Sequence, residues 1–111
     1  MKAPRFTPAY TALYPMLCDV ARSQGYALAI HGSVSSDMDL LAVPWTENPS
    51  SPSRLMHSVA EYVGAVMSTE QGDGTPLRDP EIKPHGRQAW AIPIGNGAVL
   101  DLSVMPTRSD V

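Results

Sequence analysis

HGSVSSDMDLLAVPW, residues 31–45, places two aspartates one residue apart at the start of an apolar run. Side chains alternate along a strand, so Asp37 and Asp39 share one face while Met38 and Leu40 share the other. Two carboxylates this close repel each other unless a cation lies between them. The stretch therefore predicts either a functional pair of carboxylates or a capped tight turn.

The apolar runs around this stretch predict two β-hairpins. Residues 26–30 and 38–43 are separated by too few residues for a parallel crossover, so they are expected to pair as antiparallel strands. Residues 88–94 and 98–104 flank a Gly-Asn-Gly turn, which indicates a second hairpin. Pro93 places its first strand at an edge or a bulge.

Two helices are predicted before and between the hairpins. Apolar residues recur at helical spacing over residues 11–24, with Pro15 in the first turn and Gly25 at the end. Ser51 and Pro52 begin a second helix that runs to about residue 68. Residues 69–87 read as a long loop. The expected fold is α+β: a small mixed or antiparallel sheet of two hairpins, with both helices packed on one face.

The length of the chain favours a single domain that spans residues 1–111. Hydrophobic residues make up 43% of the chain and charged residues 17%, which allows a core and argues against disorder. The net charge of −3 gives no general attraction to nucleic acid. The single cysteine, Cys18, excludes a multi-cysteine metal site. No apolar run is long enough for a membrane span and no signal peptide is visible, so a cytoplasmic protein without membrane partners is expected.

A third carboxylate occupies a similar context far along the chain. Asp101 lies between Leu100 and Leu102 in the last predicted strand, where an unpaired charge is costly. If the two hairpins are neighbours, Asp101 can reach Asp37 and Asp39. Hard cations prefer carboxylate oxygens, so the three aspartates predict a site for Mg²⁺ or Mn²⁺.

Several other residues are candidates for phosphate binding. Gly32 lets the backbone approach a phosphate, and Ser33 offers a hydroxyl and an N–H. Lys83, His85 and Arg87 could neutralise a triphosphate or an acidic acceptor, or could simply belong to a solvated turn. For the preceding His31, both a core position and a substrate contact stay open.

HGS followed by DMDLL and a later strand aspartate resembles the nucleotidyltransferase superfamily of polymerase-β-like fold, over about residues 26–104. The resemblance extends to small phage or prophage-type proteins through VPW, KPHGR and DLSVMP. It implies transfer of a nucleoside monophosphate from a nucleoside triphosphate to an unknown acceptor. Gly32 and Ser33 would hold the triphosphate, Asp37 and Asp39 would bind both metal ions, and Asp101 would help to activate the acceptor.

The sequence departs from that pattern in two ways. Only residues 34–36 separate Gly-Ser from the first aspartate, where the family commonly has about ten residues, and the chain ends shortly after the third aspartate. Three hypotheses stay open. The first is an enzyme, acting alone or completed by a second copy or a protein partner. The second is a weak or inactive relative that binds a nucleotide or a host protein, and the third is a phage-encoded inhibitor acting through its surface.

Overall fold

The structure is a computed structural model that describes residues 6–32, 34, 36–64, 80–95 and 97–107. Its helices are α1 (Thr7–Ser23) and α2 (Pro52–Tyr62), with a short 3-10 helix η2 (Pro84–Gly86). Its strands are β1 (Tyr26–Ile30), β2 (Asp37–Pro44), β3 (Glu81–Ile82), β4 (Gln88–Gly95) and β5 (Ala98–Val104).

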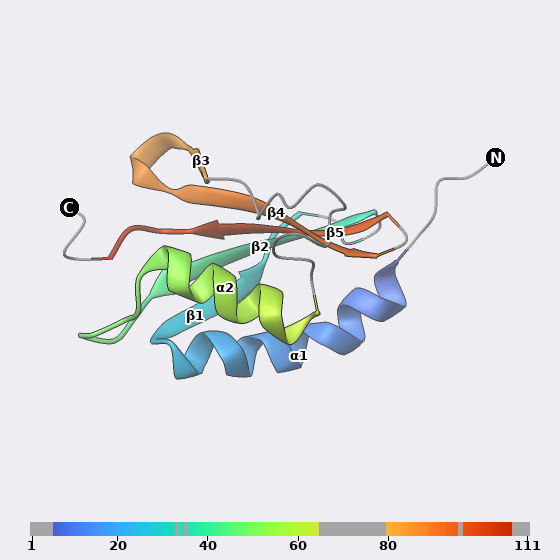
Figure 1. Ribbon diagram of the computed structural model, residues 1–111, viewed down its shortest axis with the longest axis horizontal. Helices are drawn as coiled ribbons and strands as arrows, with labels where there is room; N and C mark the ends of the chain where they lie inside the picture. The colour runs from blue at the N-terminus through green and yellow to red at the C-terminus, as the bar shows by residue number, and fades with distance from the viewer. Residues whose placement is uncertain (1–5, 33, 35, 65–79, 96, 108–111) are drawn as a thin grey trace.

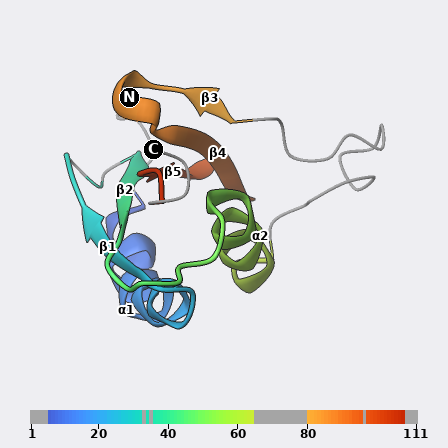
Figure 2. The same cartoon turned by 90° about the vertical axis from the view of Figure 1, so that its left-hand side faces the viewer.

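The strands form one mixed sheet in the order β1-β2-β5-β4-β3. The two predicted hairpins, β1–β2 and β4–β5, are both antiparallel, and they join through a parallel pairing of β2 with β5. Both helices lie on one side of this sheet (Figures 1 and 2). The predicted fold class is therefore confirmed.

The core lies between the helices and the face of the sheet that they cover. Alternate residues of the two central strands point into it and are almost fully buried: Met38, Leu40, Ala42, Leu100, Leu102 and Val104. The intervening residues point to the other face, which no described helix covers. We call this second surface the open face; it carries Asp37, Asp39, Leu41, Val99, Asp101 and Ser103.

Helix α1 begins four residues earlier than residue 11, where the sequence placed its start, and the prediction that Pro15 lies in the first turn was wrong. Pro8 takes the early position, and Pro15 lies inside the helix. Proline cannot donate to the carbonyl of Thr11, but both residues are exposed, so water can satisfy that carbonyl. Buried side chains elsewhere on α1, such as Leu17, offset the local cost.

Helix α2 begins as predicted, with the Ser51 side chain accepting a hydrogen bond of 3.2 Å from the Arg54 N–H. It ends at Tyr62 rather than near residue 68, and Gly64 follows with a positive φ of 71°, a common helix stop. Of the predicted 69–87 loop, residues 69–79 lie outside the described residues. The described part contains β3 and η2, which the sequence did not predict.

Two predicted breaks in regular structure are confirmed. Gly25 ends α1 with φ 91°, and a Cβ there would lie 2.5 Å from Thr46 Oγ1 and 2.7 Å from Pro49 Cα. The β4–β5 register shifts between Pro93 and Gly95. Because β3 pairs only with Gln88 and Ala89, β4 is an edge at Pro93.

Among the described residues, neither helix has the length and apolar character of a membrane span.

Candidate functional site

The three predicted carboxylates lie together on the open face. Asp39 on β2 is the register partner of Asp101 on the parallel strand β5, and Asp37 pairs with Val99 one step along the same face. Neighbouring strands lie about 4.8 Å apart, so Asp39 and Asp101 are adjacent. Asp37 is exposed, whereas Asp39 and Asp101 are half-buried.

The alternating apolar pattern fixes this arrangement. A slip of one residue along either strand would turn Leu40 or Leu102 to the open face and carry a carboxylate into the core. The core residues that hold the register therefore also hold the carboxylates side by side.

Tyr10 of α1 links the starts of β2 and β5, the two strands that carry the carboxylates. Its hydroxyl donates to the Ser36 carbonyl at 2.6 Å and accepts from the Val99 N–H at 3.0 Å. Ser36 immediately precedes Asp37, and Val99 is the register partner of Asp37. Tyr10 is fully buried and was missed by the sequence analysis, since nothing local marks a helix tyrosine as a partner of distant strands.

The loop after β1 lies against the Asp39 carboxylate. Gly32 has φ 77°, and a Cβ on it would come within 3.1 Å of Asp39 Oδ2. The His31 N–H donates to the Asp39 carbonyl at 3.0 Å, and Thr7 Oγ1 donates to the Val34 carbonyl at 2.9 Å. The backbone of this loop at Gly32 therefore lies close to the Asp39 carboxylate. Ser33 lies outside the described residues.

His31 extends the antiparallel pairing of β1 with β2, opposite Asp39. Its side chain is exposed. The alternative in which His31 belongs to the core was therefore wrong, and a substrate contact stays a prediction.

Of the three predicted basic residues, Arg87 lies on the open face beside the carboxylate strands. Its Nη1 donates to Ser103 Oγ at 2.7 Å, and Ser103 is two residues beyond Asp101 on β5. Lys83 bonds to the Arg87 carbonyl through its N–H at 2.7 Å and pairs through Nζ with Glu81 Oε2 at 3.1 Å.

The structure places His85 in η2, at the turn between β3 and β4, with an exposed side chain and a left-handed φ of 69°. This turn lies at the end of β4 where Gln88 pairs with Val104, three residues beyond Asp101 on β5. Three strand residues correspond to about 10 Å. Arg87 is thus the predicted basic residue that a side-chain hydrogen bond links to the carboxylate-bearing strand β5.

Burial raises the pKa of the Asp101 carboxyl above the usual range, and the charges of Asp37 and Asp39, with hydrogen bonds to both side chains, raise it further. Asp37 and Asp39 are therefore close enough to Asp101 to raise its pKa. Among the described residues, however, no three His, Cys, Asp or Glu side chains are already gathered as a metal-ion cage.

The residues present fit a hard divalent cation. The donors are carboxylate oxygens, which Mg²⁺ and Mn²⁺ prefer over nitrogen or sulfur. The Gly32 backbone leaves room beside the Asp39 carboxylate that a Cβ would fill. Because the backbone positions are adjacent, only side-chain torsions would have to change for Asp37, Asp39 and Asp101 to share a cation.

The raised pKa predicts how stability depends on pH. Folded Asp101 holds its proton more tightly than the unfolded chain does, so its favourable contribution is complete below the unfolded pKa of about 3.9 and is lost as the pH rises through the folded pKa. Asp101→Asn removes the ionisable group, so the variant does not lose this stability as the pH rises. The variant is expected to be more stable than wild type at neutral pH, by about 1 kcal/mol or less after solvent screening.

Urea unfolding of both proteins at about pH 7 and about pH 3.5, on either side of the usual aspartate titration, measures this difference. The gain should disappear at the lower pH. Asp19→Asn, which changes an exposed carboxylate paired with Arg22 on α1, is the matched control. A loss of stability at neutral pH in Asp101→Asn would show that the carboxylate is a structural hydrogen-bonding group.

A pocket of about 230 Å³ lies elsewhere, beside the outer strand β1. It is lined by Cys18, Arg22, Tyr26, Ala27, Leu28 and Trp45 and shares no residue with the carboxylate cluster.

The sequence was compared with protein-family models and with curated proteins, and no match was found in either.

Proposed function

We propose that the chain is a metal-dependent nucleotidyltransferase that moves a nucleoside monophosphate from a nucleoside triphosphate to an acceptor. The observation that carries the proposal is the pairing of Asp39 with Asp101 across parallel strands, with Asp37 on the same face. The loop geometry at Gly32 gives further support, because it brings the backbone close to the Asp39 carboxylate. We expect such an enzyme to act in the cytoplasm.

Each residue has a role in this proposal. Asp37 and Asp39 would hold Mg²⁺ or Mn²⁺, and Asp101 would complete the set. Bound divalent cations would neutralise the phosphate charge and align the attacking and leaving oxygens. As the resemblance implies, Asp101 would also help to activate the acceptor hydroxyl by accepting its proton.

The Gly32–Ser33 segment would bind the triphosphate. A glycine at this position lets phosphate oxygens approach backbone N–H groups, and a serine hydroxyl adds a further donor. Gly32→Ala would place a methyl group against Asp39 Oδ2 in a strained backbone conformation, so that variant should weaken triphosphate binding.

A second candidate is a protein of the same ancestry, of the phage or prophage type, that binds a nucleotide or a host protein without turnover. It is favoured by the absence, among the described side chains, of three His, Cys, Asp or Glu residues gathered as a metal cage. In this version the carboxylates would bind nucleotide and metal together, without the geometry needed for transfer.

Label transfer separates the two candidates. Wild-type protein is incubated with triphosphates labelled at the α-phosphate, Mg²⁺ or Mn²⁺, and a nucleotide-depleted bacterial lysate as the source of acceptors. If the chain is an enzyme, we expect labelled acceptor and released pyrophosphate. Both should fall about a hundredfold or more in Asp39→Asn, which corresponds to about 2.7 kcal/mol or more of lost transition-state stabilisation.

Asp19→Asn should transfer label like wild type, since this carboxylate lies on α1 and pairs with Arg22. Metal-dependent triphosphate binding without transfer of label would support the second candidate. If no triphosphate binds with either metal ion, both candidates that rely on nucleotide fail.

A further inference from the structure

Arg87 differs from Arg22 and Lys83, which form ion pairs, and from Arg54, which forms none with a described residue but is exposed. Arg22 pairs with Asp19 at 2.8 Å and Lys83 pairs with Glu81 at 3.1 Å. Arg87 is half-buried, and no described carboxylate lies within ion-pair distance of it. Its guanidinium bonds instead to a neutral hydroxyl, that of Ser103. An arginine in this environment keeps its full charge, and most of its five N–H donors can bind an anion.

Ser103 holds the guanidinium in place. Although it points to the open face, Ser103 is only 6% exposed, and its Oγ accepts from Arg87 Nη1 at 2.7 Å. Ala89 is the register partner of Ser103, and Ala91 is that of Asp101. The surface between the guanidinium and the carboxylates therefore has a floor of small side chains on β4. A ligand can span that floor.

Arg87 and the Gly32 loop lie on opposite sides of the carboxylates. In the sheet order β1-β2-β5-β4-β3, Gly32 follows β1, on the outer side of β2. Arg87 precedes β4, on the outer side of β5, and contacts β5 two residues beyond Asp101. Two strand residues correspond to about 7 Å.

The chemistry of phosphoryl transfer gives this placement a meaning. The attacking and leaving oxygens lie roughly in line, on opposite sides of the transferred phosphorus. If the triphosphate lies at Gly32, its pyrophosphate leaves on the β1 side and the acceptor approaches from the β5 side. That is the side on which Arg87 is held.

We propose that Arg87, positioned by Ser103, is a subsite for the acceptor rather than for the triphosphate. The acceptor is then an anionic molecule, with a phosphate or carboxylate group about 7 Å from the hydroxyl that reacts near Asp101. The assignment of this subsite to an acceptor rests on the proposed nucleotidyl transfer; the anion-binding role of the Arg87–Ser103 pair does not.

The first arm of the test uses inorganic phosphate and acetate as probes. Each is titrated into ¹⁵N-labelled protein without metal or nucleotide, and amide and arginine side-chain shifts are followed. The largest shifts are expected at Arg87, Ser103 and Ala89. Arg87→Met should weaken binding about tenfold, as expected for loss of hydrogen bonds from a charged group. Phosphate and acetate distinguish the two kinds of anion.

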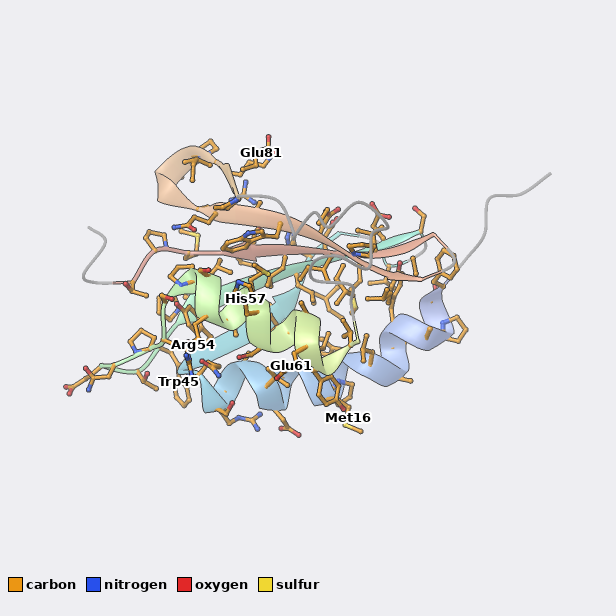
Figure 3. All side chains as sticks on the ribbon, viewed as in Figure 1. Met16, Trp45, Arg54, His57, Glu61 and Glu81 are labelled. Atoms are coloured by element: carbon orange, nitrogen blue, oxygen red, sulfur yellow. The ribbon has the colours of Figure 1, made fainter. Side chains whose placement is uncertain are left out.

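Variants of Ser103 test its positioning role. Ser103→Ala should weaken probe binding, and Ser103→Thr, which keeps the hydroxyl, should restore it. Arg54→Met is the matched control, because Arg54 is exposed on the helical side of the molecule, away from Glu81 on β3 (Figure 3). Equal weakening in Arg54→Met and Arg87→Met, or shifts confined to Gly32, would overturn the subsite.

The second arm is a calorimetric titration with Mg²⁺ and a non-hydrolysable nucleoside triphosphate. Arg87→Met should bind it as wild type does, whereas Asp39→Asn should not. If Arg87→Met weakens triphosphate binding as strongly as Asp39→Asn, Arg87 belongs to the triphosphate and the acceptor assignment is wrong. If wild type binds no triphosphate, the proposed function and the acceptor assignment fail, and the first arm alone decides whether the anion subsite exists.

Discussion

Tyr10→Phe is expected to lower the free energy of unfolding by about 2 kcal/mol, a large effect for the loss of one oxygen atom. The change leaves the apolar ring in the core and removes only the hydroxyl. That hydroxyl bonds to the Ser36 carbonyl and to the Val99 N–H, and both of these part-buried bonds would be lost. Each hydrogen bond contributes about 1 kcal/mol net, so the two together account for the expected loss.

Urea unfolding at neutral pH measures the effect of Tyr10→Phe. Tyr62→Phe removes the same hydroxyl from an exposed tyrosine of α2 and should change stability little. Ser36 precedes Asp37 in the sequence, and Val99 is the register partner of Asp37 on β5. The Tyr10 variant should therefore also bind divalent cations more weakly. A Tyr10→Phe protein as stable as wild type would mean that water replaces the hydroxyl and that Tyr10 does not fix the strand ends.

Mn²⁺ is expected to raise the melting temperature of the wild type by several degrees. The folded chain holds three carboxylates together, whereas the unfolded chain scatters them, so the cation binds mainly the folded state. At ten times the dissociation constant this contributes about 1.4 kcal/mol. For a domain of this size, such a gain corresponds to a shift of several degrees.

Asp39→Asn should lose most of that shift and be at least as stable as wild type without metal. Asp39 lies next to Asp101, and removing one of two neighbouring negative charges relieves their repulsion. Asp19→Asn is the control for cation binding elsewhere on the surface. If the metal-free Asp39→Asn protein melts well below wild type, Asp39 serves the fold through hydrogen bonds, and the tight-turn interpretation of residues 31–45 is favoured.

Local sequence signals predicted the two hairpins, the start of α2 and the shared face of Asp37 and Asp39. The last of these needs only the period of a strand. The sequence placed Asp101 beside Asp37 and Asp39 only if the two hairpins were neighbours. The structure shows that they are, because β2 pairs with β5 in parallel. This pairing joins segments about sixty residues apart in the sequence, which no local pattern encodes.

Other features were out of reach for physical reasons. Strand β3 has two residues, too few for any periodicity to appear, and it exists because it pairs with the start of β4. Pro15 was placed by its usual preference for a first turn, but packing of the rest of α1 overrode that preference. The partners of Tyr10 and Arg87 depend on tertiary contacts, so no local pattern reveals the bonds to Ser36, Val99 or Ser103.

Paramagnetic broadening by Mn²⁺ is the most direct measurement of the central claim, that three aspartates on the open face form a cation site. Small amounts of Mn²⁺ are added to ¹⁵N-labelled protein, and the loss of each amide signal is compared between wild type and Asp39→Asn. The account predicts that signals of Asp37, Asp39, Asp101 and Gly32 disappear first in the wild type and persist in the variant. Broadening that is uniform, centred on other carboxylates such as Asp19, or unchanged in Asp39→Asn would contradict it.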